Sequence, residues 1–76
     1  MAVSVSSTDD PAVTHFGTRL REAREDLGLT QEEVAQRSGV HATEISRMEA
    51  GKRDPQISTL RRLARALEVE PGQLVD

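Results

Sequence analysis

Thr43 and Arg47 lie four residues apart in a segment whose apolar residues, Ile45 and Met48, repeat with helical spacing. With Ile45 taken as the inward position, a rotation of about 100° per residue places Thr43 and Arg47 on the outward side of a helix. An outward arginine can form a bidentate hydrogen bond to O6 and N7 of guanine, and a threonine can contact a base edge or a thymine methyl group. This pair favours the reading of base edges in DNA, and the alternative is that Arg47 is a solvated surface residue.

The segments around this pair are expected to be helices, because none of them alternates polar and apolar residues as a strand does. A first helix, from Phe16, has its apolar residues on one face and ends at Gly28, where a helix end tolerates left-handed backbone angles. The third helix, residues 42–50, carries the pair. A fourth follows Asp54 and Pro55, and Pro71 suits the first turn of a short fifth. The apolar residues that mark the first, fourth and fifth helices are Phe16, Leu20, Ala23 and Leu27; Ile57, Leu60, Leu63, Ala64 and Leu67; and Leu74 and Val75.

The start of a second, short helix is marked by a capping pattern. The hydroxyl of Thr30 can accept from the amide of Glu33, the side chain of Glu33 can reach back, and Leu29 can pack against Val34. This helix is expected to run to about Arg37.

The link between the second and third helices is only about three residues long, Ser38-Gly39-Val40. Gly39 can take a positive φ, and the small side chain of Ala35 lets the two helices approach closely. Such a link forces a sharp crossing, which indicates a helix-turn-helix. The predicted fold class is all-α, a compact domain of five helices.

From Phe16 to Val75 the chain resembles the DNA-binding domain of the phage-repressor family, the Cro/C1-type or XRE-like helix-turn-helix. The segments that carry the resemblance are GLTQEEVAQRSGV, EISRMEAGKRDP and ISTLRRLARALEV. The resemblance implies a five-helix repressor-like domain in which residues 42–50 enter the major groove of double-stranded DNA. It implies sequence-specific binding, usually as a two-fold dimer, by a transcriptional regulator. Because the chain carries no sensor domain, we expect this regulator to be a small stand-alone module.

The resemblance also implies roles for single residues. Base contacts fall on His41, Ala42, Thr43 and Arg47, and a phosphate contact falls on Gln31 at the start of the second helix. The chain departs from the family at His41, where Ser or Thr is common as the helix cap, and at Glu68, where Gly is common.

The net charge of −3 and pI near 5.3 argue, taken alone, against nucleic acid. The net charge is −2 over residues 1–14 and −1 over residues 30–54, while basic and acidic residues balance over residues 15–29 and 55–76. The outer face of the third helix and the loop after it keep Arg47, Lys52 and Arg53 as a thin basic footprint, in which Lys52 and Arg53 are expected to contact phosphates. Few phosphate contacts imply a shallow dependence of affinity on salt.

Glu49 lies on the side of the third helix that faces the protein core, where it cannot remain charged without a partner. We expect a buried ion pair with Arg24, at the edge of the first helix's apolar face, and the family resemblance pairs the same positions; Arg19 is the rival partner. Glu44 either caps the amides of the third helix or accepts from cytosine N4.

The fourth and fifth helices carry two expectations. Arg61, Arg62 and Arg65 lie off the apolar face, and they are solvated, paired with local Glu, or in contact with a phosphate or a partner subunit. Residues 67–75 are expected to form a homodimer interface, because Leu74 and Val75 have little chain left to cover them. A dimer of this kind fits a palindromic operator.

Residues 1–13 are small and polar and are expected to form a loose tail before the domain at residues 14–76. No membrane span and no secretory signal are expected. His15 and His41 have no third ligand at suitable spacing, so no metal site or cofactor is expected, and catalysis is disfavoured. The absence of cysteine fits a reducing cytoplasm.

Two classes of function remain open. The first is an operator-binding regulator of the phage-repressor, restriction-modification controller or antitoxin type. The second is a protein-interaction module, or antitoxin-type partner-binding protein, that keeps the fold while its acidic surface has lost DNA binding.

Overall fold

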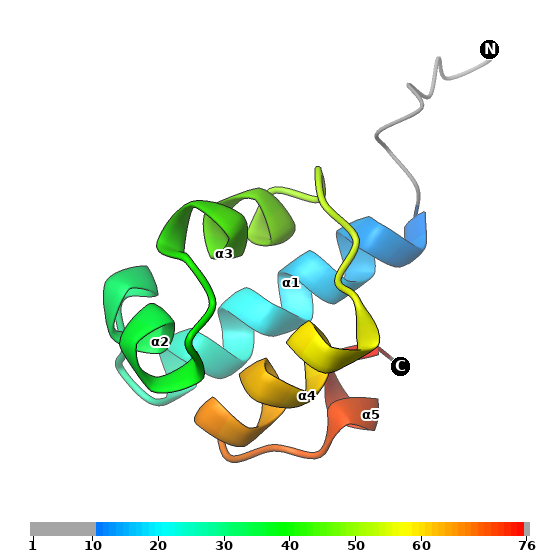
Figure 1. The fold of residues 1–76 in the computed structure, drawn as a ribbon. Helices are drawn as coiled ribbons and strands as arrows, with labels where there is room; N and C mark the ends of the chain where they lie inside the picture. The colour runs from blue at the N-terminus through cyan, green and yellow to red at the C-terminus, as the bar shows by residue number, and fades with distance from the viewer. Residues whose placement is uncertain (1–10, 76) are drawn as a thin grey trace, which may run out of the picture.

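Five helices make up the part of the chain that the computed structural model describes, residues 11–75, with side chains described from His15 onward (Figure 1). They are α1 (Pro11–Asp26), α2 (Gln31–Ser38), α3 (Ala42–Glu49), α4 (Ile57–Ala66) and α5 (Pro71–Val75). Residues 11–75 contain no strand, so the predicted all-α class and the order of helices are confirmed.

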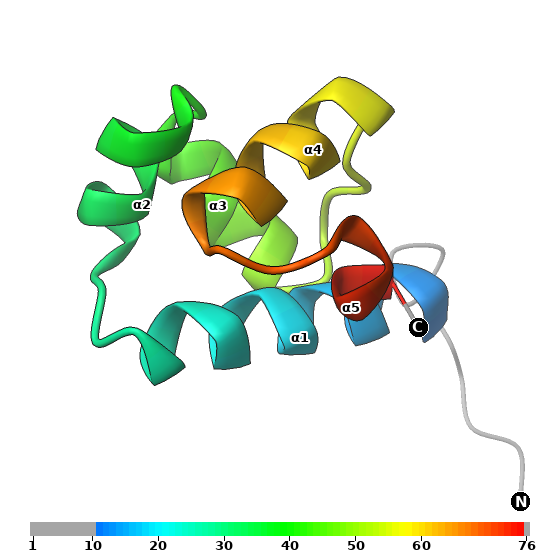
Figure 2. The same cartoon turned by 90° about the horizontal axis from the view of Figure 1, so that it is seen from below.

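The long helix α1 forms one side of the molecule, and α3 and α5 pack against it, while α2 packs on both α3 and α4 (Figures 1 and 2). The space between the helices is filled by aliphatic side chains and one aromatic ring. Leu20, Val34, Ile45 and Leu63 are fully buried. Burying residues from four helices in one cluster makes the position of α3 depend on the whole core.

The helix α1 begins at Pro11, whereas the sequence placed its start near Phe16 and a loose tail over residues 1–13. The prediction of a loose tail was therefore wrong for residues 11–13, and its remainder, residues 1–10, lies outside the described residues. Proline suits the first helical turn because its φ is already helical and its missing N–H is not needed there. Adding a residue to an existing helix costs less than nucleating one, so the segment before Phe16 can be helical without belonging to the periodic apolar face that marks the helix in the sequence.

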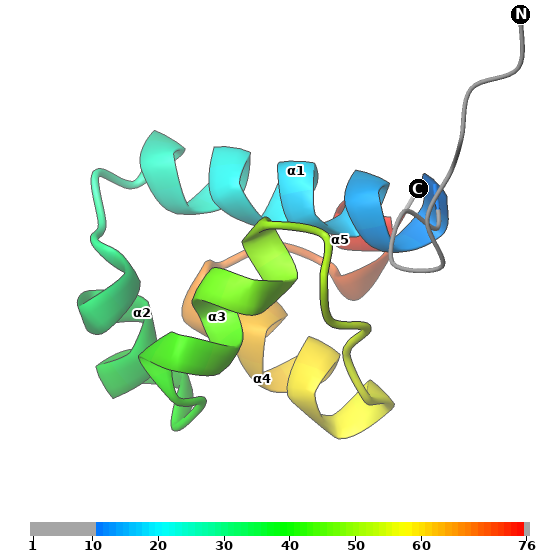
Figure 3. The same ribbon diagram turned by 90° about the horizontal axis from the view of Figure 1, so that it is seen from above.

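Three apolar residues differ from their expected exposure. Leu27 is 41% exposed because it lies beyond the last residue of α1, where the helical face no longer continues. Ile57 is 71% exposed in the first turn of α4, which projects past the neighbouring helices (Figure 3). Leu74 is only 1% exposed because α5 packs on α1, so the expected apolar patch at the C-terminal end is reduced to Val75, at 50%.

The start of α2 has the predicted capping box. The amide of Glu33 donates to the Thr30 hydroxyl at 3.0 Å, and the amide of Thr30 donates to the Glu33 carboxylate at 2.8 Å. At its other end Gly39 has φ +75° and its amide donates to the Ala35 carbonyl at 2.9 Å. These two ends confine α2 to eight residues and set the sharp turn into α3.

The helix α1 crosses the end of α3 at Gly17, a position that the sequence analysis did not single out. A Cβ atom here would overlap the carbonyl oxygen of Met48 and lie 2.9 Å from that of Glu49. The missing side chain therefore lets the backbone of α1 approach the last carbonyls of α3, which fixes how far α3 stands from the core.

Candidate nucleic-acid interface

In the view of Figure 3, α3 lies in front of α4 and turns one face away from the core. Ile45 and Met48 are buried at 0% and 1% exposure, while Thr43 and Arg47 are exposed. The prediction that Ile45 and Met48 face inward while Thr43 and Arg47 face outward is therefore confirmed. A helix presented in this way fits the width of a DNA major groove.

The N-terminal end of α3 lacks a side-chain cap. His41 stands at the N-cap with extended backbone angles, but its side chain makes no capping hydrogen bond. His41 is exposed and Ala42 is half-buried at the N-terminal end of α3. Thr43 and Arg47 lie one helical turn apart on the outer face, whereas His41 and Ala42 line a depression beside α2.

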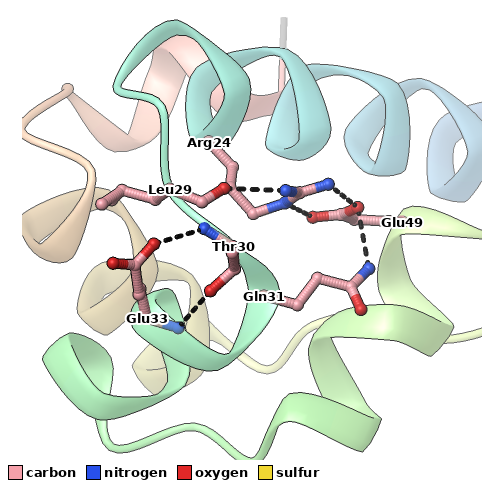
Figure 4. A network of polar contacts seen from close by, with 6 residues as sticks. All are labelled: Arg24, Leu29, Thr30, Gln31, Glu33 and Glu49. Carbon is pink, nitrogen blue, oxygen red and sulfur yellow. Dashed lines mark hydrogen bonds and ion pairs between the residues drawn. The ribbon is translucent and has the colours of Figure 1, made fainter.

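Behind this surface lies the ion pair expected between Arg24 and Glu49 (Figure 4). Arg24 Nε donates to Glu49 Oε2 at 2.7 Å and Nη2 donates to Oε1 at 2.9 Å, while Nη1 donates to the carbonyl of Leu29 at 2.8 Å. The side chains are only 13% and 5% exposed. The hydrogen bond to Glu49 raises the pKa of Arg24, against the opposing effect of burial. Arg19, the rival partner, donates instead to the carbonyl of Gln73 at 3.4 Å.

Gln31 also joins this network, which the sequence did not predict. Its Nε2 donates to Glu49 Oε1 at 3.1 Å, so the side chain at the start of α2 is tied to the end of α3 (Figure 4). A carboxamide nitrogen carries two N–H groups, so one donor remains for a further acceptor. The network links α1, α2 and α3 at the edge of the exposed face.

The basic loop after α3 is partly neutralised. Arg53 Nε lies 3.1 Å from Glu44 Oε1, with the two side chains 53% and 33% exposed. The sequence predicts that Glu44 either caps the amides of α3 or accepts from cytosine N4, and the ion pair with Arg53 is a third arrangement. Lys52 is exposed, and its amide donates to the carbonyl of Arg47 at 2.9 Å, which holds the loop against the end of α3.

The part of the chain that the structure describes has no group of three or more His, Cys, Asp or Glu that could hold a metal ion. Among the described helices, none has both the length and the apolar character needed to cross a membrane.

A short helix, a sharp glycine turn, and a second helix with one buried and one exposed face define a helix-turn-helix module of the DNA-binding kind. The comparisons agree: the chain belongs to the helix-turn-helix family of Cro/C1 type, whose sequence profile matches residues 20–74. It is a DNA-binding transcriptional regulator, and its family is not one of enzymes.

Known proteins are similar to most of this chain. An uncharacterized HTH-type transcriptional regulator of Sinorhizobium fredii, y4dJ, is 44% identical over 59 residues, which cover 78% of this chain and 77% of the relative. The control protein C.BamHI of Bacillus amyloliquefaciens is 32% identical over 62 residues, which cover 80% and 76%. The crystal structure of the restriction-modification controller protein C.AhdI of Aeromonas hydrophila matches with a TM-score of 0.82 at 37% identity, covering 86% of this chain and 98% of that one.

Proposed function

We propose that the protein reads an operator in duplex DNA with the outer face of α3, using His41, Ala42, Thr43 and Arg47 for base contacts. The observation that carries this proposal is the exposure of Thr43 and Arg47 on a helix whose opposite face is anchored in the core. Arg47 is the principal base reader, because its guanidinium can make two hydrogen bonds to one guanine.

Gln31, Lys52 and Arg53 hold the phosphate backbone on the two sides of α3 in this proposal. The bond from Gln31 to Glu49 restricts the carboxamide while leaving one N–H for a phosphate oxygen. Arg53 must exchange its exposed partner Glu44 for a phosphate, and such an exposed ion pair contributes little to stability. The footprint remains thin, so binding depends only weakly on salt.

A two-fold homodimer completes the proposed arrangement and fits a palindromic operator, with recognition helices about 34 Å apart on half-sites one turn of DNA apart. Support comes from half-exposed Val75 and from a groove of about 340 Å³ whose lining includes Leu27, Val69 and Leu74. Sedimentation that finds only monomer at high concentration, together with a non-palindromic binding site, would contradict the dimer.

Among the regulator classes, we favour a restriction-modification controller that acts in the reducing cytoplasm. The likeness to C.AhdI over nearly all of that protein and to C.BamHI supports this choice, and the lack of cysteine in the chain fits the compartment. Restriction and methyltransferase genes beside the gene for this chain are the expected finding, and a toxin gene in that place would point to the antitoxin class.

A gel-shift assay of the protein against random genomic fragments at low salt tests the proposal. We expect a small set of fragments to be retained, and footprinting of these to yield a common sequence. If no fragment is retained, the surface has lost DNA binding and the chain is a protein-interaction module with this fold.

A further inference from the structure

Four arginines line one groove on a chain whose net charge is −3. Arg37 and Ser38 come from the last turn of α2, and Arg61, Arg62 and Arg65 come from α4. The groove has a volume of about 310 Å³, and all four arginines are exposed. We call this feature the arginine groove.

The arginine groove is electrostatically unfavourable when empty. Arg61 and Arg65 are four residues apart in α4, where like charges repel one another across one helical turn. Within residues 15–75, the contact between Arg37 Nη1 and Glu68 Oε2, at 3.9 Å, is the one ion pair that involves any of the four. An anionic partner would relieve this repulsion.

Glu68 shows that a carboxylate can lie beside the groove. It follows α4 with a φ of +61°, a left-handed conformation in which a glycine would be unstrained. The chain thus keeps a carboxylate at a strained position, and that carboxylate faces the Arg37 end of the groove at 3.9 Å.

The groove lies away from the outer face of α3. Seen from above, α3 is in front of α4, and seen from below, α4 is in front of α3 (Figures 2 and 3). DNA on the outer face of α3 therefore leaves the seam between α2 and α4 open. Arg62 lies at the border, because it also lines the depression that contains His41, Glu44 and Arg53.

The surroundings of the groove favour carboxylates presented by a protein. Guanidinium groups bind carboxylates and phosphates alike through two parallel hydrogen bonds, and beside Arg37 the group already present is the carboxylate of Glu68. The chain's one aromatic residue, Phe16, is 3% exposed in the core, so no aromatic face is available on which a nucleobase could stack. The spacing of Arg61 and Arg65, about 6 Å along the helix axis, matches acidic residues one turn apart on a partner helix.

From these observations we propose that the arginine groove docks an acidic helical segment of a second protein while α3 holds DNA. The regulator would then have two separate surfaces, one for the operator and one for a protein bound beside it. Glu68 competes with the partner for Arg37.

Fluorescence anisotropy with a labelled helical peptide that carries glutamate at every fourth position tests the docking. We expect Arg65→Glu to weaken peptide binding at least tenfold, and Arg21→Glu, an exposed arginine on α1 with the same charge change, to alter it less than twofold. Glu68→Gln should strengthen binding, because it frees Arg37. Equal loss in Arg65→Glu and Arg21→Glu, or no binding of the peptide to the wild-type protein, would overturn the proposal.

Operator binding by the same variants separates docking from DNA contact. Arg65→Glu should keep wild-type operator affinity and salt dependence, and Arg65→Gln serves as a milder substitution if circular dichroism shows that Arg65→Glu is unfolded. A drop in operator affinity with a shallower salt slope in the folded variant would assign the groove to flanking DNA phosphates and overturn the proposal. If the wild-type protein binds no operator while the peptide result holds, the proposed operator contacts fail and the docking surface stands.

Discussion

Removing the carboxylate of Glu49 should destabilise the protein strongly, because it breaks the ion pair with Arg24 from one side. In Glu49→Ala, Arg24 loses two hydrogen bonds, of 2.7 Å and 2.9 Å, and Gln31 loses one of 3.1 Å. The guanidinium of Arg24, 13% exposed, is left without its counter-charge. Breaking a buried pair from one side costs about 3–5 kcal/mol. The carbonyl of Leu29 remains as one acceptor, which favours the lower end, about 3 kcal/mol.

A loss of this size is a large share of the stability of a small domain, which is on the order of 5 kcal/mol. It corresponds to a fall in melting temperature of about 12 °C or more. The pKa of Arg24 is higher in the folded than in the unfolded state. The ion pair therefore stabilises the protein in full below the unfolded pKa, and this stabilisation is lost only above the folded pKa. A melting experiment at neutral pH tests the charged form of Arg24. Glu22→Ala, at another exposed position of α1, is the matched control. Equal melting temperatures for Glu49→Ala and wild type would refute the reasoning.

Three further substitutions test single elements by urea denaturation. Gly17→Ala should destabilise by about 1–3 kcal/mol through overlap with the Met48 carbonyl, and a midpoint equal to wild type would show that α1 and α3 can move apart. Thr30→Ala should cost about 1 kcal/mol by removing the α2 cap, and a loss below experimental error would mean that water replaces the hydroxyl. Glu68→Gly should stabilise by about 1 kcal/mol by relieving the positive φ, since its exposed ion pair adds little, and a lower midpoint would contradict this.

The elements that local sequence signals specify were predicted well. The capping box at Thr30 and the turn at Gly39 each depend on a few neighbouring residues, so pattern alone located α2 and the start of α3. The separation of Ile45 from Arg47 follows from helical periodicity and needs no tertiary information. The Arg24–Glu49 pair was predictable because a charged residue on a buried face needs a partner.

The remaining features depend on contacts between elements. The burial of Leu74 follows from the packing of α5 on α1, which the sequence of α5 alone does not show. The ion pair of Glu44 with Arg53 depends on the path of the loop after α3. Gly17 had a sequence signal, since a glycine inside a helix weakens it and often has a packing reason, but its neighbour could be identified only in the folded chain.

The measurement that tests the central claim most directly is the affinity of wild type, Arg47→Ala and Gln31→Ala for a set of operators in which every base pair is changed in turn. Arg47→Ala should cost about 1–3 kcal/mol and become indifferent to one base pair, because the lost contact reads a base. Gln31→Ala should weaken binding to all operators alike, because a phosphate contact carries no sequence information. If Arg47→Ala retains the wild-type preference at every position, Arg47 does not read a base, and Thr43 becomes the leading candidate on α3.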